Sequence, residues 1–185
     1  FEEKLKVINK SGIFSNNGPV SIELQALISQ RWSNNNISLT SSATVGLLAV
    51  LCKLKNERDY NSEAFSKRNK IAVCGYGWPS SVQCPQILGF DIELFDTLAD
   101  QPIFDWSEFL PMLNKEFLAV IVTNTFGLPS FNDSHVEMLK GLNIKLICDA
   151  AHCFGIDNLF SADQIPADYY IVSTHATKVF QTAEG

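Results

Sequence analysis

The chain has 185 residues, of which 46% are hydrophobic and 18% charged, a composition that excludes a disordered segment and favours a globular domain with its own core. Its formal net charge of −6 disfavours a nucleic-acid partner, because proteins that bind the phosphate backbone usually present a basic face. The longest apolar run, 45–52, is far shorter than a membrane span, so no membrane partner is expected either.

The cysteines indicate a reducing compartment. The chain has 5 of them, an odd number, and most lie in apolar runs. The first residues do not resemble a signal peptide, so we expect buried thiols and a cytoplasmic protein. Cys148 and Cys153 lie on either side of His152, which raises the alternative of a zinc site. No second pair of ligands follows them in the sequence, and we therefore expect no bound metal.

The first half of the chain is expected to alternate between helix and strand. A helix is predicted at 21–32, where apolar residues fall on one helical stripe. A short strand is predicted at 37–40 and a mostly apolar helix at 44–54. The polar stretch 56–69 is typical of a surface connection, and the apolar run 70–75 predicts a strand.

The same alternation continues in the middle of the chain. A helix is expected at 80–89, with Pro85 in its first turn, where a missing N–H breaks no hydrogen bond. A strand at 91–96 and a short helix at 105–113 follow. The continuous apolar run 117–124 predicts another strand.

The last part of the chain adds one helix and two strands. Segment 134–142 predicts a helix that begins with a capping box of Ser134 and Glu137 and ends near Gly141. The remaining apolar runs predict strands at 144–150 and 169–174.

Apolar strands that alternate with helices at short spacing indicate an α/β fold, with a mostly parallel sheet covered by helices on both faces. In such a sheet a ligand binds beyond the carboxyl ends of the strands. The candidate site residues are therefore sought in the segments that follow strands: 40–44, 75–78, 123–127, 149–152 and 173–178.

Two of these segments suit a flat, anionic ligand. Segment 40–44 precedes a helix, and its hydroxyls and free N–H groups can hold a phosphate, although the same pattern also serves as an ordinary helix cap. Trp78 follows a Gly-Tyr-Gly turn and can stack on a planar ring. The alternative for Trp78 is a core aromatic.

Two further segments supply charged groups. Asp149 ends an apolar strand and needs a partner, such as a protonated ring nitrogen, unless it caps the next turn. His152 could face the same pocket or have a structural role. Lys178 stands among apolar neighbours, where desolvation makes an amine nucleophilic enough to form a Schiff base with a carbonyl; the alternative is an amine that extends to solvent. Ser173 could add a hydroxyl to the phosphate site.

Together these residues supply an amine, a carboxylate for a ring nitrogen, a stacking aromatic and a phosphate site, which are the contacts that pyridoxal 5'-phosphate (PLP) needs. In this combination the sequence resembles the DegT/DnrJ/EryC1/StrS family of PLP-dependent nucleotide-sugar aminotransferases. The likeness runs in order through NNGPVSIELQ, TSSATVGLL, GWPSSVQCPQILG and TNTFGLP. The most specific matches are CDAAHCFG at 148–155 and STHATKVFQTAEG at 173–185.

The resemblance implies a role for each candidate residue. Lys178 would form the Schiff base with the cofactor and transfer protons, and Asp149 would pair with the ring nitrogen. His152 would lie beside the ring, Trp78 would stack on it, and Glu184 matches an acidic residue of the family with a less defined role. The phosphate would be held by Ala43, Thr44 and Ser173.

The sequence departs from the family pattern at several positions. Ala43 stands where Gly is usual, and Gly46 stands where Ala or Asp is usual. Gly77 replaces a common Thr before the aromatic residue, and Cys148 replaces a common Glu. The lysine and the aspartate on which the chemistry depends are retained.

The resemblance also implies the fold and the activity. It implies that 1–185 is the PLP-binding large domain of transferase fold type I, incomplete, without the C-terminal remainder and the small domain. The implied activity is transfer of an amino group from an amino acid, with glutamate favoured, to a nucleotide-linked keto-deoxy sugar, in a homodimer. The alternatives are a PLP-dependent sugar dehydratase, which would carry His in place of Lys178, and a non-catalytic homologue that binds PLP or a sugar.

Overall fold

The chain forms two compact units, Phe1–Thr40 and Ser41–Gly185. In the part of the chain that is described, no helix is long and apolar enough to cross a membrane. The prediction of one large domain over 1–185 stays a prediction. The computed structural model describes the following residues: 1–15, 17–32, 36–60, 63–155 and 165–182.

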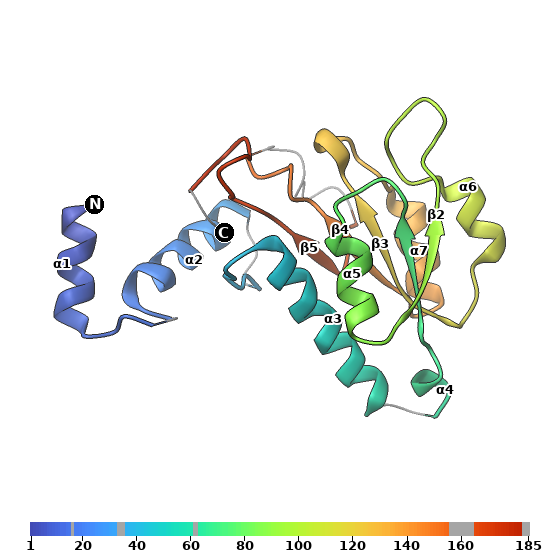
Figure 1. Ribbon diagram of the computed structural model, residues 1–185, viewed down its shortest axis with the longest axis horizontal. Helices are drawn as coiled ribbons and strands as arrows, with labels where there is room; N and C mark the ends of the chain where they lie inside the picture. Colours follow the sequence, from blue (N-terminus) through green and yellow to red (C-terminus); the bar gives the residue numbers. More distant parts are fainter. Residues whose placement is uncertain (16, 33–35, 61–62, 156–164, 183–185) are drawn as a thin grey trace. The chain divides into compact units, whose positions relative to one another are not determined.

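The first unit contains two helices, α1 (Glu2–Ser11) and α2 (Pro19–Trp32) (Figure 1). α1 ends at Gly12, whose φ of 69° is readily adopted only by glycine and stops the helix. Lys4 on α1 forms an ion pair with Glu23 on α2.

The sequence predicted this unit only in part. α2 confirms the helix expected at 21–32, and it begins earlier because Pro19 is suited to a first helical position. α1 was not expected, since no helix or strand was predicted before residue 21. The strand predicted at 37–40 is wrong: these residues are irregular, and no described strand pairs with them.

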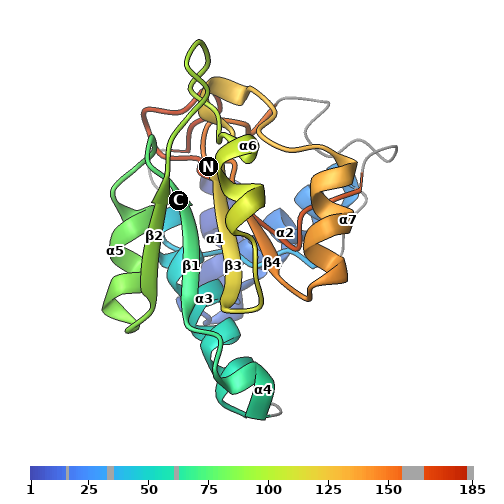
Figure 2. The ribbon, with the colours of Figure 1, turned by 90° about the vertical axis from the view of Figure 1, so that its right-hand side faces the viewer.

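The second unit is built on a 5-stranded parallel sheet with the order β2-β1-β3-β4-β5. Figure 2 shows β2, β1, β3 and β4 side by side. Every residue of β3 is buried, as expected for a central strand covered on both faces. The strands begin and end close to the predicted positions: β1 (Lys70–Cys74), β2 (Asp91–Phe95), β3 (Phe117–Thr123), β4 (Lys145–Asp149) and β5 (Tyr169–Ile171).

Helices connect these strands. Two short 3₁₀ turns, η1 (Leu110–Met112) and η2 (Thr125–Gly127), follow α6 and β3. The helices of this unit are α3 (Ala43–Asp59), α4 (Glu63–Ser66), α5 (Ser80–Ile87), α6 (Trp106–Phe109) and α7 (Asp133–Gly141).

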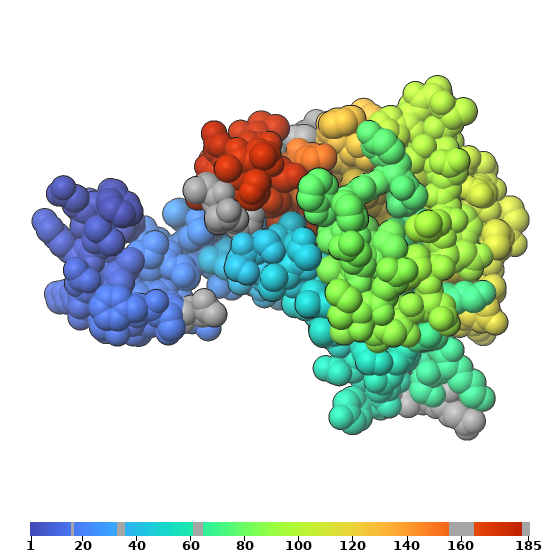
Figure 3. Space-filling view, in the orientation of Figure 1, coloured from blue at the N-terminus to red at the C-terminus, as the bar shows by residue number. Residues whose placement is uncertain are grey.

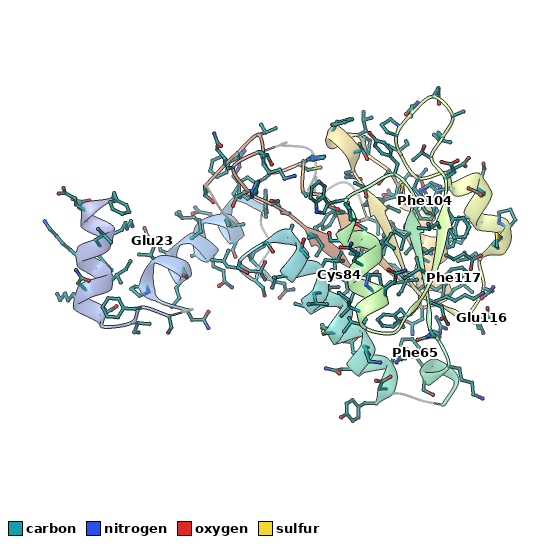
Figure 4. All side chains as sticks on the ribbon, in the orientation of Figure 1. Glu23, Phe65, Cys84, Phe104, Glu116 and Phe117 are labelled. Carbon is teal, nitrogen blue, oxygen red and sulfur yellow. The ribbon has the colours of Figure 1, made fainter. Side chains whose placement is uncertain are left out.

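Two hydrophobic cores lie on opposite faces of the sheet. On one face, Leu51 of α3 and Cys84 of α5 pack against apolar strand residues. On the other face, Phe109 of α6 and Leu139 of α7 pack against residues that include Phe117. Figure 4 labels Cys84 in the first core and Phe117 in the second. Helices therefore cover both faces, which confirms the predicted α/β fold class.

Three local predictions were wrong. The connection expected at 56–69 holds the end of α3 and the short α4. Pro85 lies beyond the first turn of α5, and the helix ends soon after it, at Ile87, where Gly89 with a left-handed φ of 80° turns the chain away.

The third wrong prediction concerns the start of α7. Its N-cap is Asn132 rather than Ser134. The Asn132 side chain accepts a hydrogen bond from the His135 N–H, at 3.2 Å, and the His135 ring accepts one from the Asn132 N–H, at 3.3 Å. This reciprocal pair satisfies two of the amides that begin the helix.

The strand order explains where a ligand site can form. From β1 the chain crosses by α5 to β2 on one side, whereas β3 lies on the other side of β1. α5, which follows β1, contributes to one core, and α7, which follows β3, contributes to the other, so these two crossovers run over opposite faces. The loops after β1 and β3 therefore diverge, and a crevice opens at the carboxyl edge of the sheet between them.

Candidate functional site

A cleft of about 740 Å³ lies at the carboxyl edge of the sheet. It is lined by the segments after β1, β3, β4 and β5 and by the start of α3. In the space-filling view, atoms of the segment after β1 (green) lie next to those of the C-terminal segment (red) (Figure 3). The structure brings all of the predicted site residues to this cleft: Ala43, Thr44, Trp78, Asp149, His152, Ser173 and Lys178.

The start of α3 provides a site for an anion. Ser42 caps the helix, and its side chain accepts a hydrogen bond from the Val45 N–H at 3.2 Å. The N–H groups of Ala43 and Thr44 belong to the first turn, where no helical carbonyl is available to them. The helix dipole adds partial positive charge at the same point. The Ser173 hydroxyl lines the same cleft and is only 4% exposed, so this corner suits a phosphate.

Asp149 places a buried carboxylate on the floor of the cleft, at the end of β4. Its side chain is 8% exposed and accepts a hydrogen bond from the Ala151 N–H at 3.0 Å. Burial raises the pKa of this carboxyl, while the Ala151 N–H and the charges of His152 and Lys178 lower it. A carboxylate in this setting is stabilised by a cation, such as a protonated ring nitrogen.

His152 lies against an aromatic ring at the wall of the cleft. Its imidazole stacks on Phe126, with ring centroids 5.8 Å apart and planes inclined by 7°. Burial lowers the pKa of His152, and the charge of Lys178 acts in the same direction. The imidazole is therefore neutral near pH 7.

Phe126 is a residue of the site that sequence reasoning missed. Its φ of 52° is left-handed, which is uncommon for a residue other than glycine, and its side chain is 72% exposed. Nothing in the sequence around TNTFG indicates this conformation. The only signal was its position within the segment 123–127 that follows a strand.

Lys178 is carried by a turn that follows β5. The Lys178 N–H donates to the His175 carbonyl at 2.9 Å, and the His175 Nδ1 accepts from the Thr177 N–H at 3.2 Å. Both His175 and Thr177 also line the cleft. Their place just before the lysine is the signal that could have singled them out. Glu184 lies outside the described residues.

Trp78 stands at the mouth of the cleft. It is 71% exposed, so the alternative of a core aromatic is wrong. It follows Gly77, where an added Cβ would lie 3.0 Å from the Thr123 Oγ1. The loop after β1 therefore packs closely over the end of β3 while the indole stays available to stack on a ligand.

The described side chains can hold a flat ligand that has a phosphate at one end and a cationic ring nitrogen at the other. The phosphate corner, the Asp149 carboxylate and the Lys178 amine line one cleft. Among the described residues, no group of 3 or more His, Cys, Asp or Glu side chains is arranged to hold a metal ion. The amine is the available nucleophile for a carbonyl carbon on such a ligand.

The chain matches the model of a known protein family. The model of the DegT/DnrJ/EryC1/StrS aminotransferase family matches residues 1–185. A dTDP-4-amino-4,6-dideoxy-D-glucose transaminase from Shigella dysenteriae is 23% identical over 181 residues, which cover 98% of this chain and 46% of that protein.

Solved structures show the same fold. A protein from Bacillus cereus that carries the name of a PLP-dependent aminotransferase matches with a TM-score of 0.77 and 26% identity, over 99% of this chain and 49% of that one. The E. coli GDP-4-keto-6-deoxy-D-mannose-3-dehydratase with bound hydrated PLP matches with a TM-score of 0.78 and 15% identity, over 99% and 46%. The chain thus spans about half the length of the relatives that it matches.

Proposed function

Since this chain belongs to the DegT/DnrJ/EryC1/StrS aminotransferase family, we propose that it binds PLP and acts as an aminotransferase. The amino group would pass from an amino acid, with glutamate as the favoured donor, to a nucleotide-linked keto-deoxy sugar. The observation that carries this proposal is that Lys178, Asp149 and the start of α3 line the same cleft.

The residues of the cleft fit PLP. Asp149 is a buried carboxylate that accepts a hydrogen bond from the Ala151 N–H, and it forms no ion pair among the described residues. The hydroxyl of Thr125 lines the cleft, is buried, and has no hydrogen-bond partner among the described residues. Such an unpartnered group is expected where a polar ligand binds. The helix start suits the phosphate, as described above.

Each residue would then have a distinct task. The first turn of α3 and Ser173 bind the phosphate, and Trp78 covers one face of the ring. Asp149 holds a proton on the ring nitrogen. PLP, when bound, supplies an electron-accepting ring that stabilises negative charge on the neighbouring carbon. The Lys178 amine would accept and return the proton that is exchanged during amino transfer.

The substrates are proposed from the relatives. The name of the Shigella relative describes an amino-dideoxy sugar linked to dTDP, which supports a nucleotide-linked sugar here. In the net reaction the donor becomes a keto acid and the sugar carbonyl becomes an amine, so no other reactant is needed. We also propose that 1–185 is the PLP-binding part of a homodimeric enzyme, since the relatives are about twice its length.

A dehydratase is the second candidate, because one structural relative carries that activity in its name. At 15% identity this likeness supports the fold alone. The sugar dehydratases of this family would carry His where this chain has Lys178, and the retained lysine favours amino transfer.

The experiment is a chemical trap at Lys178. The protein in its complete form is mixed with PLP, reduced with borohydride and digested, and the labelled peptide is identified by mass spectrometry. We expect the label on Lys178 in the unmodified protein and in a Lys140→Ala control, which loses an exposed lysine of α7 instead. We expect no label in Lys178→Ala.

Transfer of ¹⁵N from labelled glutamate then separates the candidates. Appearance of ¹⁵N on bound cofactor supports an aminotransferase, whereas trapping of PLP without nitrogen exchange from any amino acid would indicate a non-catalytic homologue. A protein that binds no PLP at all would overturn the proposal.

A further inference from the structure

Two buried hydroxyls near Asp149 have no hydrogen-bond partner among the described residues. Ser81 is 1% exposed and Thr123 is 7% exposed. Neither Ser81 Oγ nor Thr123 Oγ1 has a hydrogen-bond partner among the described residues. A buried hydroxyl without a partner destabilises a fold, so such groups in a native structure call for an explanation.

Thr123 lies directly beside Asp149. The two residues end adjacent parallel strands and are register partners between β3 and β4. Paired residues on parallel strands point to the same face of the sheet. Both side chains also line the cleft. The Thr123 hydroxyl therefore stands on the cleft floor next to the carboxylate.

Ser81 approaches Asp149 from α5. Its hydroxyl is among the groups that lower the pKa of the Asp149 carboxyl, although no hydrogen bond joins the two side chains in the structure. Its N–H donates to the Trp78 carbonyl at 3.0 Å. Ser81, in the first turn of α5, thus contacts the loop that carries Trp78 and also lies near the Asp149 carboxylate.

We propose that Ser81 and Thr123 are positioning residues for Asp149, whose hydroxyls hold the carboxylate oriented and ionised toward the cationic nitrogen of a bound ring. This inference rests on the proposed function and deepens it. One Asp149 oxygen accepts from the Ala151 N–H. The hydroxyls supply donors for the lone pairs that this amide leaves free.

Gly77 belongs to the same arrangement. A Cβ at this position would lie 3.0 Å from Thr123 Oγ1, a contact so tight that the hydroxyl would have to shift by a few tenths of an ångström. The absence of a side chain at Gly77 therefore keeps room for Thr123 to turn toward the carboxylate.

Other titratable groups also lie near Asp149, and a test of the two hydroxyls must leave these groups unchanged. His152 and Lys178 lower the pKa of Asp149 through their charges. Burial raises the pKa of the Cys148 and Cys153 thiols, and the nearby Asp149 carboxylate raises it further. Both thiols are therefore neutral near pH 7. None of these groups is altered by the substitutions below.

The experiment measures binding of pyridoxine 5'-phosphate, which has the ring nitrogen and the phosphate of PLP but no aldehyde to react with Lys178. Its dissociation constant is measured by calorimetry from pH 5 to pH 8 for the complete protein and for Ser81→Ala and Thr123→Val. We expect each variant to bind roughly tenfold more weakly near pH 7, which matches the loss of a hydrogen bond to a charged group. Since donors stabilise the carboxylate, the fall of affinity on acidification should also begin at a higher pH in both variants.

Conservative variants separate positioning from folding. Ser81→Thr and Thr123→Ser keep a hydroxyl and should restore both the affinity and the pH profile, and thermal melts should show that all variants are folded. The outcome against the inference is an affinity and pH profile in Ser81→Ala and Thr123→Val equal to those of the unmodified protein, while Asp149→Asn binds poorly. If the unmodified protein itself does not bind the probe, it is the proposed function that fails.

A double-mutant cycle tests the role of Gly77. Gly77→Ala should weaken binding in the unmodified background, because the new Cβ displaces the Thr123 hydroxyl. The same change should have little effect in a Thr123→Ala background, where no hydroxyl is left to displace. Equal effects in both backgrounds would show that Gly77 acts independently of Thr123, which contradicts this part of the inference.

Discussion

Asp149 is a residue whose burial affects the stability of the fold. The carboxylate is buried, and burial raises its pKa. A carboxyl whose pKa is higher in the folded state than in the unfolded chain favours folding while it is protonated. That stabilisation is lost as the pH rises above about 3.9, the ordinary pKa of aspartate, and through the raised value.

We therefore predict that Asp149→Asn makes the cofactor-free protein more stable near neutral pH. The amide has a similar shape but carries no charge to be desolvated. The stability advantage of the variant over the unmodified protein should shrink as the pH falls toward 4. Thermal melts of both proteins between pH 4 and pH 8, without PLP, measure it.

A pH-independent difference between the two melting temperatures would contradict this prediction, because it would mean that the charge of Asp149 does not matter to the empty fold. Glu137→Gln is a suitable control, since it removes an exposed carboxylate of α7.

At the scale of single residues, the sequence predicted the groups whose chemistry is unusual for their surroundings. Lys178 and Asp149 stand out because a charge directly follows or interrupts an apolar run. Ser81, Thr123 and Phe126 do not stand out, because their importance depends on burial without a partner or on a left-handed backbone. Those properties arise only when distant segments meet.

At the scale of elements, α7 is stabilised at its start by Asn132. The side chain accepts from the His135 N–H, and the Ser134 hydroxyl donates to the same oxygen at 2.7 Å. We predict that Asn132→Ala lowers the free energy of unfolding by about 1 kcal/mol, the usual effect of losing an N-cap. Chemical denaturation of both proteins measures the difference.

Ser134→Ala is the matched control, because the Ser134 hydroxyl contacts the side chain of the N-cap residue but is not itself the N-cap. It should destabilise the protein by less than Asn132→Ala does. The reverse order would mean that the helix begins at Ser134, as the sequence pattern indicated.

This element also shows why element ends are hard to predict. Asn132 and Ser134 are both good N-cap residues, and each is followed after three residues by a side chain that can reach back. His135 also stacks on Trp106 of α6, with centroids 4.1 Å apart. That tertiary contact favours one of two locally similar starts, and a pattern along the chain does not contain it.

At the scale of the second unit, Arg68 connects segments that lie far apart in the sequence. The side chain is 8% exposed, and its guanidinium donates to the carbonyls of Leu142 and Asn143 at 2.9 and 3.0 Å. It also lies 5.1 Å from the ring centroid of Phe65. It thereby ties the entry to β1 to the turn between α7 and β4.

We predict that Arg68→Met destabilises the protein by about 1–3 kcal/mol, because the partly buried carbonyls that it contacts lose their donor. Lys115→Met removes an exposed cation and should change stability by less than about 0.5 kcal/mol. Urea denaturation measures both differences, and a similar small effect for the two variants would contradict the role of Arg68.

The sheet as a whole was predictable in its class but not in its order. Apolar runs predicted the strands and the parallel arrangement. Nothing in those runs places β3 and β2 on opposite sides of β1. Several orders satisfy the same runs and crossover lengths, and the choice among them decides where the cleft opens.

The two cores make the free cysteines natural reporters of how this unit opens. Cys84 lies in one core, and Cys74, Cys148 and Cys153 lie in the other. A buried thiol reacts with an alkylating reagent only when its surroundings open. The labelling rates of these cysteines in the native protein would therefore report separately how often each face of the sheet becomes exposed. No cysteine has to be introduced for this measurement.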